Sequence, residues 1–537
     1  MGGTDEAAGF GRVGRTKERA FRALLLASTL AGIVALGGLL VYVGWQAFNL
    51  QAASTSWFAL VGGVGLAPAV VAAALLRRRG HSVAVGLESL VTLFGGGMLA
   101  GGAGIFFVVV DPVAWFATAL AAGLTVGATV AVNRYTGLPA WPRVGFAAVV
   151  TWLALLGVPG TVPSLAGVVG GLSVLPSDVV IYALSLALPA SAAVGALVAA
   201  RTDDRRRGLR AGALGAVATV AIGVAVGLVT GVGPAGGLLV AVFGLLPAGV
   251  HAWATVERED VSAGGLALPV VVSAGVAAAW YLHGALDLAG PNPWVDWTFL
   301  TALPSTFAPR TAGIFPAIVG SLLLMIVVVV FAFPVGVGAA VYLEEYAPDS
   351  RTTRFIQLNI SNLAGVPSVV YGLLGLAIFI HQFAMPSGSV LVGGLALGLL
   401  ILPIVIISAR EAIRSVPDAA REASYGMGAT RWQTVRNVVL PQAIPGILTG
   451  TILALGRAIG ETAPLLMIAA PATYLGVPQG FTAPAAAMPL QIYDLAFLPD
   501  DAFREGFVPA GVVTLLAVLL TMNGVAIVLR NRYERGN

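Results

Sequence analysis

The sequence predicts an all-α integral membrane protein, a polytopic helical bundle of about 14 transmembrane helices. Composition is the first reason, since 58% of the 537 residues are hydrophobic, only 10% are charged, and the mean hydropathy is +0.92. Second, apolar runs of about 20 residues, the length that crosses a bilayer core, recur along the whole chain. Third, arginine gathers in alternate loops, as expected for loops retained on the cytoplasmic side.

The N-terminal segment is polar and basic, and one long apolar run follows it. Basic residues such as Arg15 and Lys17 predict a cytoplasmic N-terminus, because positive side chains are retained inside. The run 22–50 is too long for the apolar region of a signal peptide and lacks a convincing cleavage site. We therefore expect residues 1–50 to form a cytoplasmic N-terminus and an uncleaved first span.

Residues 51–287 are expected to form an inserted membrane block of about eight helices, whose function the residues do not indicate. Eight apolar runs define these helices: 57–76, 85–110, 113–132, 144–160, 178–200, 211–230, 234–254 and 264–286. The loops expected inside carry clusters such as Arg205–Arg207, whereas the outer loops hold Asp111 and Asp178 but no arginine. The run 144–160 is the weakest, because the apolar stretch that follows it would also suit a re-entrant segment.

The second half of the chain is expected to contain an outer loop and five more spans. The outer loop, 288–312, is rich in Pro and Trp, and Trp favours the membrane interface. The core, 313–535, contains apolar runs near 314–343, 359–383, 389–408, 446–470 and 508–530. This threading puts a polar loop, 409–441, and the C-terminus in the cytoplasm, and it leaves Arg310 and Arg504 on outer loops.

Several classes of function are excluded by what the sequence lacks. Without cysteine there can be no disulfide framework, thiol catalysis or Cys-metal site. Lys17 is the only lysine and Glu18 follows it, so the chain has no Gly-Lys-Ser/Thr phosphate-binding loop and is not itself an ATPase. The four histidines lie in different segments without metal-ligand spacing. Glycine pairs such as Gly97 and Gly101 predict close helix packing rather than nucleotide binding.

The polar loop 409–441 is expected to fold as a helix–turn–helix at the membrane surface. Ser415 with Asp418 resembles a capping box, so a short helix should begin near Val416. Gly426 and Gly428 can end that helix in a left-handed turn. The loop is rich in arginine, which places it inside.

Within this loop the order Glu422-Ala423-Ser424, then Gly428, then Val438-Val439-Leu440-Pro441 resembles the EAA loop of binding-protein-dependent ABC importer permeases. The resemblance implies a coupling helix that sits in a groove of a cytoplasmic ATPase. The matching positions, which take the ATPase-coupling role, are Glu422, Ala423, Gly428, Leu440 and Pro441. Ser424 departs from the family pattern, where a second Ala is usual, and Val438 replaces the usual Ile. An amphipathic surface helix without a coupling role is the alternative.

One expected span contains a charge, in the stretch Gly456-Arg457-Ala458-Ile459-Gly460-Glu461-Thr462-Ala463-Pro464. A charge there costs at least ~2.5–3.5 kcal/mol, so Arg457 should face a partner or a wet cavity. Glu461 lies four residues further on, on the same face of a helix, and is able to pair with it. Arginine suits a phosphate pathway because its fork makes two parallel bonds to an oxyanion. The alternative is an ion pair that only neutralises itself and pins two helices.

The same stretch closely resembles the phosphate ABC permeases of the Pst type, as does the stretch Asn362–Gly372. Gly313–Gly320 and Tyr342–Ala347 are similar to the PstA type more than to its PstC-type partner. The resemblance covers about Trp297–Arg535 together with the first span. It implies a type I ABC importer permease core in the C-terminal half, which translocates inorganic phosphate across the cytoplasmic membrane.

The resemblance also implies partners and site residues. The partners are a PstC-type permease in a heterodimer, two copies of a PstB-type ATPase that bind ATP and Mg, and a PstS-type phosphate-binding protein. No cofactor, metal or nucleic acid is expected in this chain. Arg457 would draw the anion, and Glu461 would hold its guanidinium. Asn362 and Ser368 would offer hydrogen bonds along the substrate pathway, or else satisfy helix ends.

Three other functions remain open on the residues alone. An importer of another tetrahedral oxyanion, such as sulfate or molybdate, would share every motif. An ion-coupled secondary transporter would predict a midplane acidic relay and internal repeats, which are not evident, and it would leave the coupling loop unexplained. The third is a membrane sensor whose permease-like half no longer transports. Normal phosphate uptake after Arg457→Ala, together with altered phosphate-response signalling, would favour it.

Overall fold

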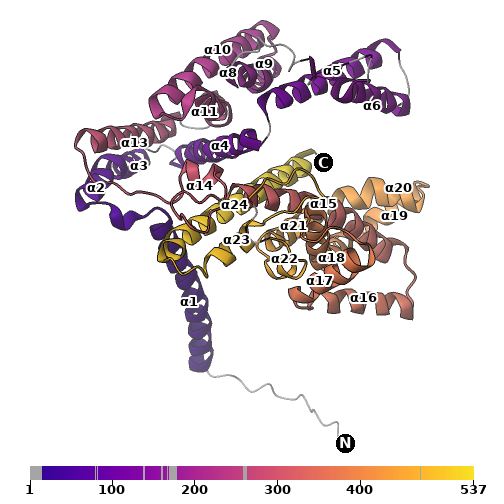
Figure 1. Ribbon diagram of the computed structural model, residues 1–537. Helices are drawn as coiled ribbons and strands as arrows, with labels where there is room; N and C mark the ends of the chain where they lie inside the picture. The colour runs from indigo at the N-terminus through magenta and orange to yellow at the C-terminus, as the bar shows by residue number, and fades with distance from the viewer. Residues whose placement is uncertain are drawn as a thin grey trace, which may run out of the picture. The chain divides into compact units, whose positions relative to one another are not determined.

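The structure, a computed structural model, is helical throughout the residues that it describes (Figure 1). These residues are 15–78, 80, 83–109, 111–136, 140–158, 161, 163–165, 167–168, 178–257, 263–471, 473 and 475–536. They form no strand, although an isolated bridge joins Ser389 to Pro484. The all-α prediction is confirmed. The chain divides into two compact units: unit 1 comprises Met1–Ala53 and Pro291–Asn537, and unit 2 comprises Ser54–Gly290.

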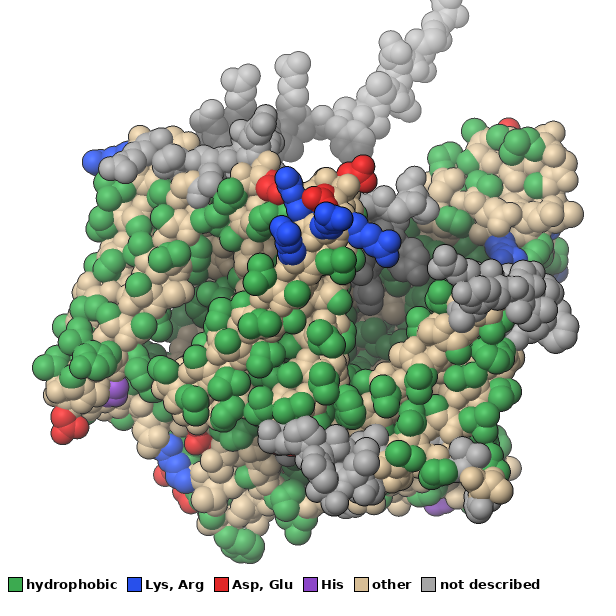
Figure 2. All heavy atoms as spheres, turned by 90° about the horizontal axis from the view of Figure 1, so that it is seen from above, with side chains coloured by type: hydrophobic (Ala, Val, Ile, Leu, Met, Phe, Trp, Pro, Cys, Tyr) green, Lys and Arg blue, Asp and Glu red, His purple; other side chains and the backbone are tan. Residues whose placement is uncertain are grey.

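Twelve helices in the described residues are long and apolar enough to cross a membrane, and a bent pair adds a thirteenth if it counts as one span. Large apolar side chains are exposed along these helices, and hydrophobic side chains are spread over the face seen in Figure 2. Soluble proteins rarely expose so much apolar surface, because its contact with water is unfavourable. The chain is therefore a multi-pass membrane protein, as its composition predicts.

Three of the expected spans differ from their predicted form; one of them, 446–470, is interrupted where a helix ends at Ala458. The weakest one, 144–160, corresponds to α6 (Ala140–Leu156), a helix of 17 residues. Most of the stretch from 159 to 177 lies outside the described residues, including the expected re-entrant alternative. The expected span 359–383 is divided into two helices, α16 (Arg351–Ala364) and a helical segment Ser368–Gln382, bent by 106°.

A proline explains the division of this span. Pro367 is extended, with φ −55° and ψ 139°, and it caps the start of α17 (Ser368–Gly375). Its ring disfavours the α-helical conformation for the residue before it, so α16 ends at Ala364. α16 is polar and none of its residues is buried, whereas α17 is apolar. Because the hydropathy average includes residues of both helices, the break between them is not detected and one span is predicted.

Unit 2 is built from paired helices. In chain order they are α2 (Thr55–Leu60), η2 (Val61–Leu66), α3 (Ala67–Arg78), α4 (Val83–Val109), α5 (Pro112–Thr136), α6, α8 (Asp178–Tyr182), η3 (Ala183–Ala187), α9 (Leu188–Thr202), α10 (Arg205–Thr230), α11 (Gly233–Val240), η4 (Ala241–Leu245), α12 (Leu246–Val256), η5 (Ala263–Leu266) and α13 (Ala267–Ala285). α10 packs against both α9 and α11, while α4 packs against η4 and α12.

Glycine allows helices of unit 2 to approach backbone to backbone. A Cβ added to Gly96 of α4 would lie 2.2 Å from the carbonyl oxygen of Phe243, which no real side chain would tolerate. Gly97 and Gly101, the expected packing pair, face open space instead. Close packing is therefore confirmed for this segment of α4, but it is made by Gly96 and not by Gly97 and Gly101. One step along a helix turns the side chain by about 100°, so the neighbour of a packed glycine faces elsewhere.

Six turns of π-helix in the described residues share one sequence feature, since each ends just before an X-Pro pair. The prolines are Pro68, Pro189, Pro247, Pro348, Pro441 and Pro509. The residue before each proline donates its N–H to the carbonyl five residues back, as Leu188 does to Ala183. A proline ring crowds the carbonyl four residues before it, so the turn widens. Proline positions thus predict where these helices widen.

Unit 1 places its core between three long helices. Its elements are α1 (Arg15–Ala47), η1 (Leu50–Ala52), α14 (Trp297–Thr301), α15 (Phe315–Val341), η6 (Tyr342–Tyr346), α16, α17, η7 (Leu376–Gln382), α18 (Val390–Arg414), α19 (Asp418–Gly426), α20 (Arg431–Thr434), η8 (Val435–Val439), α21 (Leu440–Ala458), α22 (Ala463–Met467), α23 (Met488–Leu495), η9 (Phe503–Phe507) and α24 (Val508–Gly536). α15, α18 and α21 meet in a cluster that includes the fully buried Ala340, Ala409 and Ile413.

The two arginines expected on outer loops both have partners within unit 1. The guanidinium of Arg310 lies 3.6 Å from the centroid of the Trp294 ring. Arg504 forms an ion pair with Asp501. Arg310 is therefore stabilised by a cation–π contact and Arg504 by an ion pair.

Candidate functional site

The polar loop between α18 and α21 folds, as predicted, into two helices joined by a turn. α19 begins at Asp418 rather than near Val416, with Pro417 extended ahead of it. The expected capping box is wrong, because Ser415 donates its hydroxyl hydrogen to the carbonyl of Ala412 at 2.7 Å and so stays bound to the preceding turn. Gly428 has φ +83°, the left-handed conformation expected to end the helix.

Polar contacts hold α19 against α20. The hydroxyl oxygens of Ser424 and Thr434 are 2.9 Å apart, and both residues are buried. Thr430 and Gln433 form a capping box that starts α20. Ser424 is a position where the loop departs from the pattern it resembles, and its hydroxyl accounts for the change. An alanine there would remove a hydrogen-bond partner from the buried Thr434 hydroxyl.

α19 presents an exposed face that contains two of the expected coupling residues, Glu422 and Ala423. Glu422 and Ala423 are exposed, and the apolar side chain of Met427 beside them is 83% exposed. Leu440 and Pro441 are half-buried at the start of α21. An acidic group on a short helix, beside an exposed methionine at its end, is a surface suited to contact with another protein.

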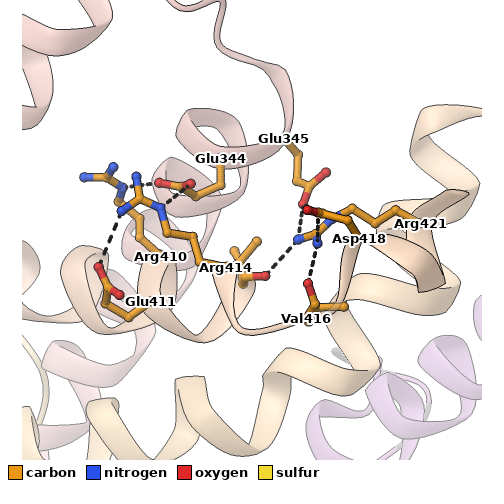
Figure 3. Close-up of polar contacts among 9 residues, drawn as sticks. Glu344, Glu345, Arg410, Glu411, Arg414, Val416, Asp418 and Arg421 are labelled. Carbon is orange, nitrogen blue, oxygen red and sulfur yellow. Dashed lines mark hydrogen bonds and ion pairs between the residues drawn. The ribbon is translucent and has the colours of Figure 1, made fainter.

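Arg421 anchors α19 to the rest of unit 1 (Figure 3). Its guanidinium lies 3.2 Å from the carboxylate of Glu345 and 3.1 Å from that of Asp418. It also donates to the carbonyl oxygens of Ile413, at 2.8 Å, and Val416. The Arg421 and Glu345 side chains are only 15% and 6% exposed. Because this pair is largely removed from water, removing one partner would cost about 3–5 kcal/mol.

The neighbouring Glu344 holds the end of α18 in the same way. Its carboxylate oxygens accept hydrogen bonds from Nε of Arg410 at 2.6 Å and Nε of Arg414 at 2.8 Å. Figure 3 shows both guanidinium groups turned toward this carboxylate. The two glutamates of η6 therefore join the end of α15 to α18 and to α19. Sequence reasoning missed them as site residues, because no spacing rule connects Glu344 with an arginine 66 residues away.

Arg457 and Glu461 form the predicted ion pair, with 3.2 Å between Nε and Oε1. α21 ends at Ala458, however, so the pair closes across a helix end, and the expected span 446–470 is interrupted there. The Arg457 side chain is 50% exposed, whereas that of Glu461 is 18% exposed. The carboxylate is therefore largely buried, while half of the arginine side chain is exposed.

Asn362 and Ser368 lie on opposite sides of the break between α16 and α17. Tyr371 of α17 reaches back across this break and donates its hydroxyl hydrogen to the carbonyl of Leu363 at 2.7 Å. No hydrogen bond within the described part of the chain joins Asn362 or Ser368 to Arg457. The structure therefore pairs Arg457 with Glu461 and does not bring all four predicted pathway residues into one bonded cluster.

The two helix breaks are nevertheless neighbours. α17, which follows one break, packs against α22, which follows the other. A Cβ added to Gly372 would lie 2.8 Å from Cα of Pro464, so the two backbones are in direct contact. Interrupted backbone at membrane depth is tolerated where it is buried in protein or lines a wet cavity. A half-exposed arginine at such a place can bind an anion.

Among the residues that the structure describes, no group of three or more His, Asp or Glu side chains is arranged to hold a metal ion.

Comparisons with known proteins assign this chain to a family. The family described as "Binding-protein-dependent transport system inner membrane component" matches residues 265–535. The chain is 35% identical over 257 residues to the phosphate transport system permease protein PstA 1 of Mycobacterium tuberculosis, a match that covers 48% of this chain and 80% of that protein. It is also 35% identical over 226 residues to the phosphate transport system permease protein PstA of Yersinia pestis, covering 41% of this chain and 74% of that protein.

A solved structure of the MetNI methionine ABC transporter in an inward-facing conformation is similar over 41% of this chain and 97% of its own, with 16% identity and a TM-score of 0.34. The polar loop 409–441 and the Arg457–Glu461 pair lie inside the residues that the family matches. The chain belongs to the binding-protein-dependent transport system inner membrane components, the transmembrane permease subunits of ABC importers.

Proposed function

We propose that this chain is the permease subunit of an ATP-driven importer that translocates inorganic phosphate across the cytoplasmic membrane. The observation that carries the proposal is Arg457, half exposed and paired with Glu461 at a helix end beside a second helix break. A guanidinium makes parallel charge-assisted bonds to an oxyanion. PstA permeases named for phosphate transport, at 33–36% identity, support the same substrate.

The energy for transport would come from partner subunits. The proposed complex contains a PstC-type permease in a heterodimer with this chain, two copies of a PstB-type ATPase that bind ATP and Mg, and a PstS-type protein that delivers phosphate from outside. With both termini in the cytoplasm, α19 faces the ATPase. Residues 51–287 would be an insertion between the first span and the permease core.

In the proposed cycle, phosphate released by the binding protein enters a cavity between the two permease subunits. Arg457 draws the anion, while Glu461 orients the guanidinium and offsets its charge when no anion is bound. Asn362 and Ser368, beside the neighbouring helix break, offer hydrogen bonds to the anion as it passes. Interrupted helices suit this role because they present polar groups at membrane depth.

The coupling step is assigned to α19 and to the start of α21. The residues that would contact the ATPase are Glu422, Ala423, Gly428, Leu440 and Pro441. Movement of the ATPase on ATP binding and hydrolysis would displace α19. The buried Arg421–Glu345 pair would carry that displacement to α15, and rigid helices would transmit it to the cavity.

Uptake by the reconstituted complex tests this function. Proteoliposomes containing all subunits are supplied with loaded binding protein, and labelled phosphate, sulfate and molybdate are compared with ATP or a non-hydrolysable analogue inside. We expect phosphate uptake that requires ATP hydrolysis, with sulfate and molybdate at background. ATP-independent uptake would contradict the importer mechanism, and preferential uptake of sulfate or molybdate would contradict the substrate.

A further inference from the structure

A second cluster of arginines lies in a pocket between α16 and α18, and Arg457 does not line it. The pocket has a volume of about 300 Å³, roughly ten times the volume that one water molecule occupies in the liquid. Its polar lining is Arg354, Gln357 and Ser361 from α16, and Arg410, Glu411 and Arg414 from α18. This is enough room for a small polyatomic ion.

Two matching helix faces form the pocket. On each helix the lining residues recur at spacings of three and four, so they share one face. α16 and α18 pack together, and these two faces oppose each other. No residue of α16 is buried, so its polar face lines the pocket and does not pack into the core.

The charges around the pocket leave an excess of positive charge. Glu344 pairs with Arg410 and Arg414, and Glu411 lies 3.7 Å from Arg414. Arg354 forms no ion pair with any residue in the described ranges. Three guanidinium groups and two carboxylates therefore leave one net positive charge, which favours an anion.

The hydrogen bonds to Glu344 orient the guanidinium groups of Arg410 and Arg414 but occupy only one N–H donor of each. Both contacts are made through Nε, and a guanidinium carries five N–H donors. The terminal nitrogens of Arg410 make no hydrogen bond within the described residues. Gln357 and Ser361 likewise have no side-chain partner among those residues, so they are available as further donors. Glu344 holds two positive groups side by side, an arrangement that a bound oxyanion would stabilise.

We propose that this pocket binds a phosphate group through Arg354, Arg410 and Arg414, with Gln357 and Ser361 as additional donors. Planar guanidinium forks match the geometry of phosphate oxygens, whereas a cation or a neutral ligand would gain nothing from the excess charge. The phosphate group is supplied either by free inorganic phosphate or by a lipid headgroup. The site goes beyond the proposed transport function, because it binds a phosphate group whatever substrate the complex carries.

Ligand binding to the full chain in lipid nanodiscs tests the pocket without any ATPase present. All samples carry Arg457→Gln, so that the candidate transport site does not contribute. Arg354→Gln is the test variant. Arg351→Gln is the matched control, because it removes the same charge from an exposed position of the same helix that does not line the pocket. Labelled inorganic phosphate is titrated into nanodiscs of zwitterionic lipid, and retained phosphatidic acid is measured by native mass spectrometry in a second set.

We expect saturable phosphate binding that Arg354→Gln weakens tenfold or more, since a hydrogen bond between charged groups is worth about a factor of ten. Arg351→Gln leaves the binding unchanged. If Arg354→Gln instead lowers only the retention of phosphatidic acid, the pocket binds a lipid headgroup, which supports the same chemistry. Equal binding of both ligands by the Arg354→Gln and Arg351→Gln proteins overturns the proposal.

Discussion

At the scale of single residues, burial decides which charge fixes α19. Arg421 contacts two carboxylates at similar distances, but Glu345 is 6% exposed and Asp418 is 90% exposed. A surface ion pair contributes about 0–1 kcal/mol, because water and salt screen it. A buried pair that loses one partner leaves an uncompensated charge. The two carboxylates should therefore differ in importance despite their similar geometry.

Glu345→Gln is expected to lower the stability of the chain by about 3–5 kcal/mol, and Asp418→Asn by about 0–1 kcal/mol. Both variants replace a carboxylate by an amide of nearly the same shape, so each serves as the control for the other. Thermal denaturation of the purified chain in detergent measures the difference. Equal shifts in the denaturation midpoint would contradict the assignment of Glu345 as the buried anchor.

At the scale of elements, the turn after α19 depends on backbone conformation. Gly428 adopts φ +83°, whereas Gly426 lies within the helix with open space where a Cβ would be. Gly428→Ala should cost about 1–2 kcal/mol through left-handed strain, and Gly426→Ala should be neutral or gain about 1 kcal/mol of helix propensity. Denaturation midpoints and the coupling of ATPase activity to uptake check both. A neutral Gly428→Ala variant would show that the turn adopts another conformation.

Helix packing in unit 2 offers a second matched pair. Gly96→Ala would force a Cβ against the carbonyl of Phe243, while Gly97→Ala would meet no atom within 4 Å. We expect the Gly96 variant to lose about 1–3 kcal/mol by overpacking and the Gly97 variant to be unaffected. Yield and thermal stability after membrane extraction measure this. Comparable loss in both variants would argue against the contact between α4 and η4.

Elements could be located from the sequence better than their interruptions. Hydropathy located the apolar helices because an average over 20 residues is insensitive to detail. The same averaging concealed the breaks at Pro367 and after Ala458, although the proline was a readable signal for the first. The Arg457–Glu461 pair could be predicted because its partners are close in sequence. The Glu344–Arg410 contact could not, because it depends on how α15 packs against α18.

At the scale of the whole molecule, every predicted site residue belongs to unit 1. Unit 2 has its own glycine-mediated packing and its own apolar helices. The residues of unit 2 do not indicate a function, and peripheral packing, partner docking and regulation stay open as its role. The family match begins at residue 265, within the last helices of unit 2, and continues through the polar loop 409–441 to residue 535 in α24. The residues proposed to take part in transport therefore all lie in unit 1, which would assemble with the other subunits.

The central claim is that Arg457 binds the transported anion and does more than neutralise Glu461. Phosphate uptake by the reconstituted complex is compared for the wild type, Arg457→Gln and the double variant Arg457→Gln/Glu461→Gln. The single variant leaves an unpaired carboxylate, a cost that the double variant removes. We predict that both variants lose uptake by tenfold or more, because neither retains the guanidinium. Recovery of wild-type uptake in the double variant would contradict this, since it would leave the pair a purely structural role.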